Sequence, residues 1–344
     1  MPDLELLPDV HDVAVLQITI QNPTSYATAS PHVQHIAIQN AYLSWLLGVP
    51  IDARNIAFGD PQANALAPSW YSGFDGTYHH FFIKTGQIPA SSSYTLYLIY
   101  SYKKTLIDGK TAGISAWAGQ YLYGIPYGQL DNGSSIFLLY DNFAGTSLSS
   151  AWTQYLNGNS ISVNNGLTMT AQSGTNGNMG LVRSLTPVST GAAVHMMYDV
   201  LQCCGCNGGN DLDVVLGYSL SYPWSGYGYG TADYSFGGSQ KNIVKSSNGV
   251  TLLVSLNTSC SVQKNIFYLF EWLYTTTSYL YHYDNINANL SATDSSYNPS
   301  SITQIELGAS IPNANTASYL IHHVAVYDPP PVQPDLPVSI SAIY

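Results

Sequence analysis

The chain has 344 residues and a net charge of -11, with 20 acidic residues against 9 Lys and Arg. Only 8% of its residues are charged, where a typical soluble domain has about 25%. Nine basic residues are too few for a nucleic-acid-binding surface. The sequence contains no run of about 18 apolar residues that would cross a membrane, and its 45% apolar content excludes a disordered chain.

Tyrosine is the residue in excess, with 28 copies. Hydroxyl and amide groups therefore supply most of the polar surface, and such a surface does not depend on ion pairs. Acidification is expected to cost a fold of this kind little stability. The composition predicts an extracellular protein, at the surface of a cell or of a virion.

The predicted elements are almost all short strands rich in aromatic and β-branched residues, separated by Gly, Asn, Pro and Ser turns. A single segment of the first half, 38–48, fits a helix or a strand equally well. The predicted strands, in chain order, are 13–21, 78–86, 93–102, 134–143, 160–171, 193–202, 213–222, 250–256, 265–274, 277–285, 302–310 and 318–328.

Strands at this spacing, without a long helical period, predict an all-β fold of two consecutive β-sandwich or jelly-roll domains. We expect an N-terminal extension over 1–15, a β-sandwich domain over 16–138 and a jelly-roll domain over 139–328. The proline-rich linker "DPPPVQPDLP" is expected to be stiff. The last domain boundary is placed there, so that 329–344 form a linker and a terminal strand.

Two stretches carry a resemblance to known families. The segment 53–100 resembles a β-sandwich family of archaeal and bacterial surface proteins with no known reaction. The motif "YDNFAGTSLSSAW" and the closing strand "IHHVAVYDPPP" resemble a concanavalin-like (laminin-G-like) jelly roll. The closing strand has His322 and His323 where an acid and an aromatic residue are usual. Together these similarities cover 20–328, and they imply the architecture and a surface setting.

Concanavalin-like folds include glycosidases, which need two carboxylates about 5 to 10 Å apart. The chain has three glutamates, Glu5, Glu271 and Glu306, and none has an acidic neighbour at the expected spacing. Asp211 and Asp213 share one face of a strand but lack a third acid. No G-x-S-x-G motif indicates a serine hydrolase. The sequence therefore predicts that the protein is not an enzyme.

Four cysteines raise the choice between zinc and disulfides. Cys203, Cys204 and Cys206 lie in "CCGC", and Cys260 follows 54 residues later. Neighbouring cysteines on a strand point to opposite faces, which makes a tetrahedral zinc site difficult. In an extracellular protein an even number of cysteines favours disulfides. We expect two, one from the 203–206 loop to Cys260 and one within the loop.

Other polar groups have weaker signals. Asp211 and Asp213, with the neighbouring Asn207 and Asn210, carry the hard oxygen ligands that calcium prefers, although a solvated turn explains them as well. We expect no cofactor other than this calcium ion. The pairs His79–His80 and His322–His323 lie on strands, so one member of each is expected to face inward.

The segment 217–238 is the candidate for recognition, on what is expected to be a long exposed loop. Flat aromatic rings with hydroxyl groups suit sugars and protein partners alike, and a self-packed loop is the alternative. The candidate ligand- or partner-binding residues are Tyr222, Trp224, Tyr227 and Tyr229.

Sequons at Asn132, Asn257 and Asn289 predict glycosylation sites. The terminal strand 338–344 either adds to the sheet of a neighbouring subunit, returns to its own sheet or begins a further domain. On these grounds we expect a non-enzymatic structural protein of an archaeal exterior, a virion turret, spike or fibre or a surface filament subunit. Its expected partners are its own copies, other exterior structural proteins and cell-surface glycans. The alternative is a carbohydrate-binding adhesion module.

Overall fold

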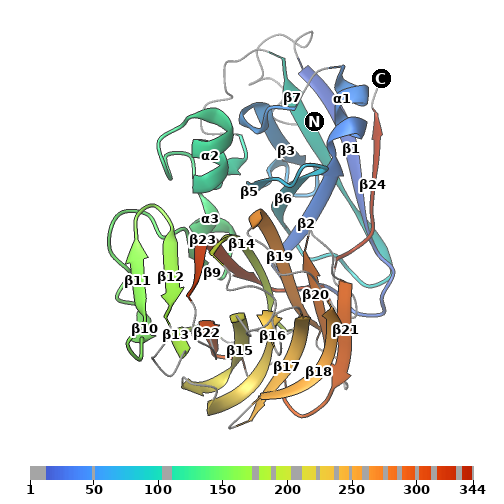
Figure 1. Cartoon of the computed structure of the whole chain (residues 1–344). Coiled ribbons are helices and arrows are strands. Elements are labelled where there is room, and N and C mark those ends of the chain that lie inside the picture. The colour runs from blue at the N-terminus through green and yellow to red at the C-terminus, as the bar shows by residue number, and fades with distance from the viewer. Residues whose placement is uncertain are drawn as a thin grey trace. The chain divides into compact units, whose positions relative to one another are not determined.

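A computed structural model describes residues 13–48, 51–102, 111–172, 178–186, 191–202, 211–221, 225–235, 240–247, 250–257, 263–273, 278–284, 289–298, 302–310, 316–330 and 335–342. The fold is all-β, which confirms the predicted class. The chain divides into two compact units, unit 1 with Met1–Phe137 and Pro329–Tyr344, and unit 2 with Leu138–Asp328. Figure 1 shows the course of the chain through its strands.

Unit 1 contains two sheets. The five-stranded sheet has the order β24-β1-β7-β3-β4, formed by β24 (Val338–Ala342), β1 (Val13–Asn22), β7 (Ser92–Ser101), β3 (Ile56–Asp60) and β4 (Ala65–Leu66). The four-stranded sheet has the order β2-β6-β5-β8, formed by β2 (His32–Gln39), β6 (Tyr78–Thr85), β5 (Ser69–Phe74) and β8 (Gly113–Ile114). The terminal strand β24 therefore returns to β1 of its own chain.

Short helical segments connect these strands: α1 (Asn40–Leu47), the 3-10 helix η3 (Ala53–Asn55), α2 (Ala116–Tyr123) and α3 (Gly133–Ile136). The ambiguous segment 38–48 thus contains a helix, which ends at Gly48 in the left-handed conformation with φ 68°. Helix α2 begins at Ser115, whose hydroxyl accepts a bond from the Ala118 amide, and this bond satisfies one free N–H of the first turn.

The core of unit 1 lies between its sheets. In β1 the burial alternates, with Leu16, Ile18 and Ile20 buried, as expected for a strand with one face on a core. Phe58 of one sheet meets Phe81 of the other edge to face, with ring centroids 5.4 Å apart.

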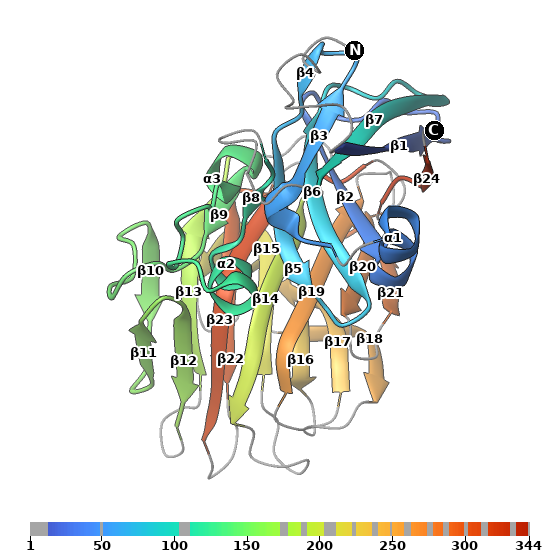
Figure 2. The same cartoon turned by 90° about the horizontal axis from the view of Figure 1, so that it is seen from above.

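Unit 2 is a two-layered jelly roll. Its seven-stranded sheet has the order β10-β13-β22-β15-β16-β17-β18, formed by β10 (Trp152–Tyr155), β13 (Asn178–Ser184), β22 (Gln304–Ser310), β15 (Asp211–Ser221), β16 (Ser225–Ser235), β17 (Gln240–Ser247) and β18 (Val250–Asn257). Figure 2 shows these strands side by side.

The eight-stranded sheet is the second layer. Its order is β11-β12-β23-β14-β19-β20-β21, with β9 also pairing β23, and it is formed by β9 (Leu139–Asp141), β11 (Ser160–Val163), β12 (Leu167–Ala171), β23 (Ala317–Tyr327), β14 (Ala193–Gln202), β19 (Gln263–Leu273), β20 (Ser278–Asp284) and β21 (Asn289–Asp294). One core joins the layers, because Met196 and Val324 of this sheet cluster with Val214, Leu216 and Leu307 of the other.

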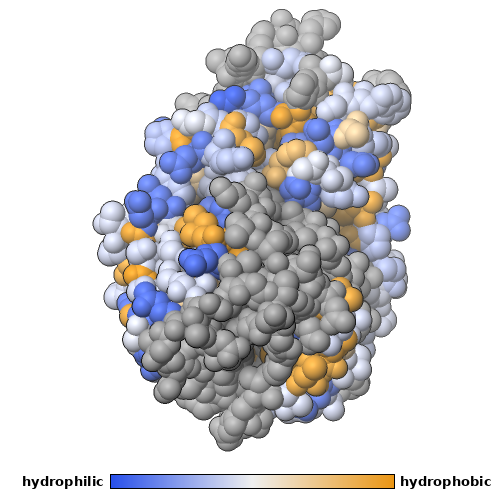
Figure 3. All heavy atoms as spheres, viewed as in Figure 1, coloured by the Kyte–Doolittle hydropathy of each residue, from blue (hydrophilic) through white to orange (hydrophobic). Residues whose placement is uncertain are grey.

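Among the described residues, no helix is long and apolar enough to cross a membrane. On the face drawn in Figure 3, the hydrophobic residues of the described part form separate patches among hydrophilic ones. Large exposed apolar side chains do occur, and Trp45 on α1 is 78% exposed. Isolated residues of this kind are common on soluble surfaces and define no site by themselves.

Candidate functional site

The outer face of the seven-stranded sheet carries the most unusual group of side chains. Alternation along β15 sends Val214 and Leu216 into the core, so Asp213 and Val215 belong to the opposite face. In β22, Leu307 is a core residue, which places Glu306 and Gly308 on the same outer face. The strand register pairs Asp213 with Gly308 and Val215 with Glu306.

Small residues occupy much of this outer face. Gly180 of β13 pairs with Gly308 of β22, and Gly217 of β15 pairs with Gly228 of β16. Gly230 pairs with Val215. Glycine weakens a strand and is often found where another group approaches the backbone closely. At these glycine positions of the central strands, the face therefore consists of backbone without side chains.

Glu306 is a buried carboxyl group on that face, with an exposed fraction of 3%. Among the described residues, its Oε1 atom has no hydrogen-bond partner. Burial raises the pKa of Glu306 to about 8, because the ionised form loses its hydration. Glu306 therefore holds a proton at neutral pH, the state that a general acid requires.

Asp213 lies beside Glu306 on the neighbouring strand and is fully buried. The two residues occupy diagonal positions of the β15–β22 ladder, which places their Cβ atoms about 7 Å apart. The Asp213 carboxylate leans over Gly308, since a Cβ atom at position 308 would lie 3.1 Å from Asp213 Oδ2. Two carboxyl groups with different environments thus share one face.

Apolar groups border the two acids. Val182, Val215 and Leu220 form a small buried cluster, against which Tyr155 packs. The Leu220 amide donates a hydrogen bond to the side-chain oxygen of Gln304. A few polar groups within a mainly apolar surround are typical of small-molecule sites.

Sequence spacing conceals this pair, because the expected spacing of catalytic acids is that of residues close together along the chain. Asp213 and Glu306 are 93 positions apart and meet only because β15 and β22 are neighbours. The signal was present in "DLDVV" and "QIELG". Each places an acid among β-branched or apolar residues, where a strand buried on both faces is expected.

The other predicted sites are only partly described. The four cysteines, Tyr222 and Trp224 lie outside the described residues. Asp211 begins β15, and no group of three His, Cys, Asp or Glu in the described part is arranged to hold a metal ion. The disulfides and the calcium ion stay predictions.

Tyr227 and Tyr229 lie in strand β16, not in a long loop as expected. The register pairs Tyr227 with Tyr218 and Tyr229 with Leu216, which belongs to the core. The loop was expected because six glycines in 217–238 suggested a break in the sheet. Hydrogen bonds along β15 and β17 hold this strand despite its glycines.

The histidine pairs also differ from expectation, because both members of each pair are buried. His79 and His80 lie on β6, and the ring of each is hydrogen-bonded within unit 1. His322 lies at a bulge between β14 and β23 and pairs with Asp199 at 3.2 Å. Burial lowers the pKa of His323 to about 3, so this ring is neutral in the folded protein.

Of the three sequons, Asn132 is described in full. Its amide nitrogen donates to the Ser69 carbonyl at 3.3 Å. Asn257 ends β18 and Asn289 begins β21. Glycosylation stays a prediction at all three.

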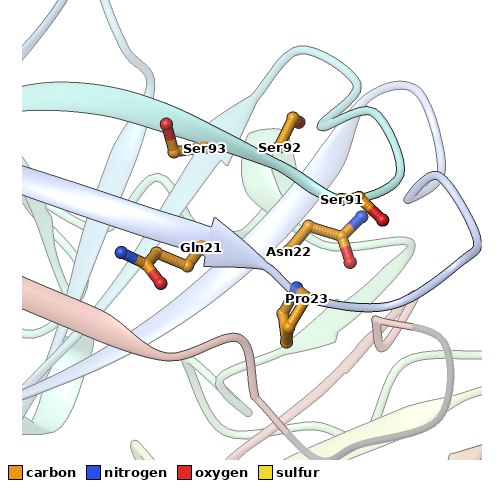
Figure 4. Close-up of a pocket in the computed structure, with 6 residues that line it drawn as sticks. All are labelled: Gln21, Asn22, Pro23, Ser91, Ser92 and Ser93. Carbon is orange, nitrogen blue, oxygen red and sulfur yellow. The ribbon is translucent and has the colours of Figure 1, made fainter.

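A pocket of about 400 Å³ lies where β1 ends and β7 begins, lined by Gln21, Asn22, Pro23, Ser91, Ser92 and Ser93 (Figure 4). The Asn22 amide donates to the carbonyls of Ile88 and Pro89, and the Ser92 hydroxyl also donates to Pro89. These bonds hold the turn together, so the side chains serve the fold.

Comparisons with known proteins give structural matches only. No protein-family profile and no curated protein matches the sequence. One similar structure is named for endo-acting O-glycanases of human gut microbiota (13% identity, TM-score 0.42, covering 56% of this chain and 98% of that one). Another is the metal-free carbohydrate recognition domain of Emp46p (10%, 0.39, 52% and 88%).

A third is the catalytic domain of an endo-1,3-beta-glucanase (laminarinase) from Thermotoga petrophila RKU-1 (9%, 0.41, 56% and 97%). Identities this low show the fold alone, a concanavalin-like jelly roll as the motifs implied. The prediction of a non-enzymatic structural protein of an archaeal exterior is wrong, because the similar structures are those of glycan hydrolases and carbohydrate-recognition domains.

Proposed function

We propose that unit 2 binds carbohydrate on the outer face of its seven-stranded sheet. The observation that supports this proposal is the buried pair Glu306 and Asp213, which lies on a glycine-rich face of the sheet. A folded protein gains nothing in stability from a buried carboxyl oxygen without a hydrogen-bond partner, such as Glu306 Oε1 among the described residues. Its presence on an outer sheet face is best explained by a ligand.

Each part of the face has a counterpart in a sugar. Hydroxyl groups of a sugar are donors and acceptors, so a protonated Glu306 and the Asp213 carboxylate provide complementary groups. The glycines allow a ring to approach the backbone. Val182 and Val215 are suited to the apolar C–H surface of a sugar ring.

Access to Glu306 requires movement, since its exposed fraction is 3%. A ligand reaches the carboxyl group only when the atoms that now cover this face give way. We therefore expect binding to change the hydrogen exchange of β15 and β22 more than that of β1 and β7 in unit 1.

A glycan array with the intact chain tests the binding proposal. Asp213→Ala is expected to weaken binding at least tenfold, because a hydrogen-bond partner of the sugar is lost. The matched control is Asp294→Ala, which removes another carboxylate of unit 2 that pairs with Lys245. Binding that survives Asp213→Ala, or that falls equally in both variants, contradicts the proposal.

Glycan cleavage is a second candidate function, favoured by the pKa of Glu306, which burial raises to about 8. Glycosidases use one protonated and one ionised carboxyl group on the two sides of the scissile bond. Glu306 would protonate the leaving glycosidic oxygen as the C–O bond breaks. Asp213 would accept the proton of the water that adds to the sugar.

Release of reducing ends from a panel of polysaccharides tests this second function. Glu306→Gln keeps the shape of the side chain but removes the proton donor, so a loss of about 100-fold or more is expected. Binding is expected to survive in this variant. Cleavage that is unchanged in Glu306→Gln and Asp213→Asn would place the reaction elsewhere in the chain.

We also propose an extracellular location, supported by the low charge, the tyrosine-rich composition and the three sequons. In this setting the four cysteines would form two disulfides. The motifs of 53–100 support a relationship of unit 1 to surface-protein β-sandwiches. Mass spectrometry of the protein from its native source, with and without reduction, tests the disulfides and the glycans together.

A further inference from the structure

Unit 1 contains a chain of four buried or half-buried titratable groups that none of the functions above uses. Asp335 Oδ2 lies 2.9 Å from His35 Nδ1, and His35 Nε2 lies 3.1 Å from His80 Nδ1. His80 Nε2 in turn lies 3.0 Å from Asp75 Oδ2. The two imidazole planes are nearly parallel, at 4°, so one line of hydrogen bonds joins the two carboxylates.

The number of protons in this chain follows from its geometry. The two outer bonds require a proton on His35 Nδ1 and one on His80 Nε2, because a carboxylate only accepts. The central bond joins two ring nitrogens and needs one further proton, on His35 Nε2 or His80 Nδ1. All three bonds therefore exist only when the two rings together carry three protons, one more than two neutral rings.

The position of the extra proton is also defined. Burial, and then the charge of His35, lower the pKa of His80, although its bond to Asp75 acts in the opposite direction. His80 is thus the neutral ring that accepts at Nδ1. In this arrangement His35 donates at both ring nitrogens, to His80 Nδ1 and to Asp335, whose side chain is 31% exposed. Asp75 is fixed as an acceptor because its other oxygen accepts the amides of Thr77 and Tyr78 at 2.7 Å.

Asp335 belongs to the C-terminal segment 335–342, and the Gln21 amide donates to the carbonyl of Pro337 in this segment at 2.9 Å. Strand β24 pairs with β1, the side chain of Leu336 is buried, and the Tyr42 hydroxyl donates to the Ile340 carbonyl at 2.8 Å. The His35–Asp335 bond fastens the start of this segment to the four-stranded sheet.

We propose that Asp335, His35, His80 and Asp75 form a relay, a chain of hydrogen bonds that holds one extra proton and attaches the C-terminal segment 335–342 to the four-stranded sheet. The attachment of this segment is then strongest within a limited pH window. A second extra proton places N–H against N–H at the centre and two cations side by side. Loss of the extra proton leaves two lone pairs facing each other, or one lone pair facing Asp335. Either change breaks one bond of the relay.

Other charged groups face the relay. On β2, His32 is close enough for Asp335 to favour its protonated form. On β6, His79 lies next to His80, and each charged ring disfavours the other. Phe82 packs against His35 with ring centroids 4.9 Å apart and contributes no charge. Protonation of His32 and His79 therefore adds to the effect of acid on the relay.

Hydrogen exchange of the intact chain between pH 5 and pH 9, corrected for the intrinsic rate, tests the proposal. Protection of 335–342 is expected to pass through a maximum and to fall at least threefold on each side, relative to that of β7. Tyr42→Phe removes a hydrogen bond to the segment that lies outside the relay, so it is expected to lower the protection of 335–342 by the same factor at every pH. His80→Asn removes the central ring and is expected to abolish the alkaline fall.

Protection of 335–342 that does not vary with pH relative to β7 would overturn the proposal. Nitrogen-15 spectra of the histidine rings provide a second readout that does not depend on variants. At the maximum, His35 is expected to have both ring nitrogens protonated and His80 only Nε2. Two neutral rings at that pH would overturn the relay as well.

Discussion

Replacing Glu306 by glutamine is expected to stabilise unit 2 at neutral pH. In the folded chain burial raises the pKa of Glu306 from 4.5 to about 8, so its ionisation favours the unfolded state. The destabilisation is absent below about pH 4.5, grows as the pH rises and levels off above about pH 8. From these two pKa values it amounts to about 3 kcal/mol at pH 7 and about 1 kcal/mol at pH 5.

A glutamine side chain does not ionise in either state, so the variant avoids this cost while keeping the shape of the side chain. Denaturant unfolding of wild type and Glu306→Gln at pH 5 and pH 7, followed by hydrogen exchange of β15 and β22, measures the difference. A larger gain at pH 7 than at pH 5 is expected. A variant that is less stable than wild type, or a gain independent of pH, would refute the burial argument.

Three further predictions concern other parts of the fold. Burial lowers the pKa of His32 and His79 to about 4, so the chain takes up protons when it unfolds below pH 6.5. Each histidine is expected to lower the free energy of unfolding by about 2 kcal/mol at pH 5, which denaturant unfolding at a series of pH values measures. Gly308→Ala is expected to cost about 1–3 kcal/mol because its Cβ would meet Asp213, whereas Gly59→Ala, with contacts of 3.5 Å or more, should cost less in the same assay. Ser115→Ala removes the cap of α2, and thermal unfolding should show a loss of about 1 kcal/mol.

The prediction for His32 and His79 revises an expectation from composition. A surface of hydroxyl and amide groups predicts tolerance of acid, but that argument concerns exposed groups. The buried histidines lower the stability of the fold in acid, because a buried neutral ring is difficult to protonate and gains its proton only when the chain unfolds.

Many of the strands were readable from the sequence, but β2, β5, β13 and β17 were not predicted, and the predicted strand 134–143 begins within helix α3. Alternation as in β1, where Leu16, Ile18 and Ile20 are buried, reports a sheet with one face on a core, and the turns between strands have their own residue signals. Strand β16 was missed because Gly228 and Gly230 resemble a loop locally. Its pairing with β15 and β17 is a tertiary property that no local pattern records.

The sequence by itself determined the all-β class, the jelly-roll resemblance and the exclusion of a nucleic-acid-binding surface, because these depend on composition and on short-range alternation. Only the tertiary structure decided which distant groups meet. Strand order brings Glu306 to Asp213, and the return of β24 brings Asp335 to His35. Pairing between strands far apart in sequence is set by the whole packed sheet, and the shifted pKa values follow from the burial that this packing creates.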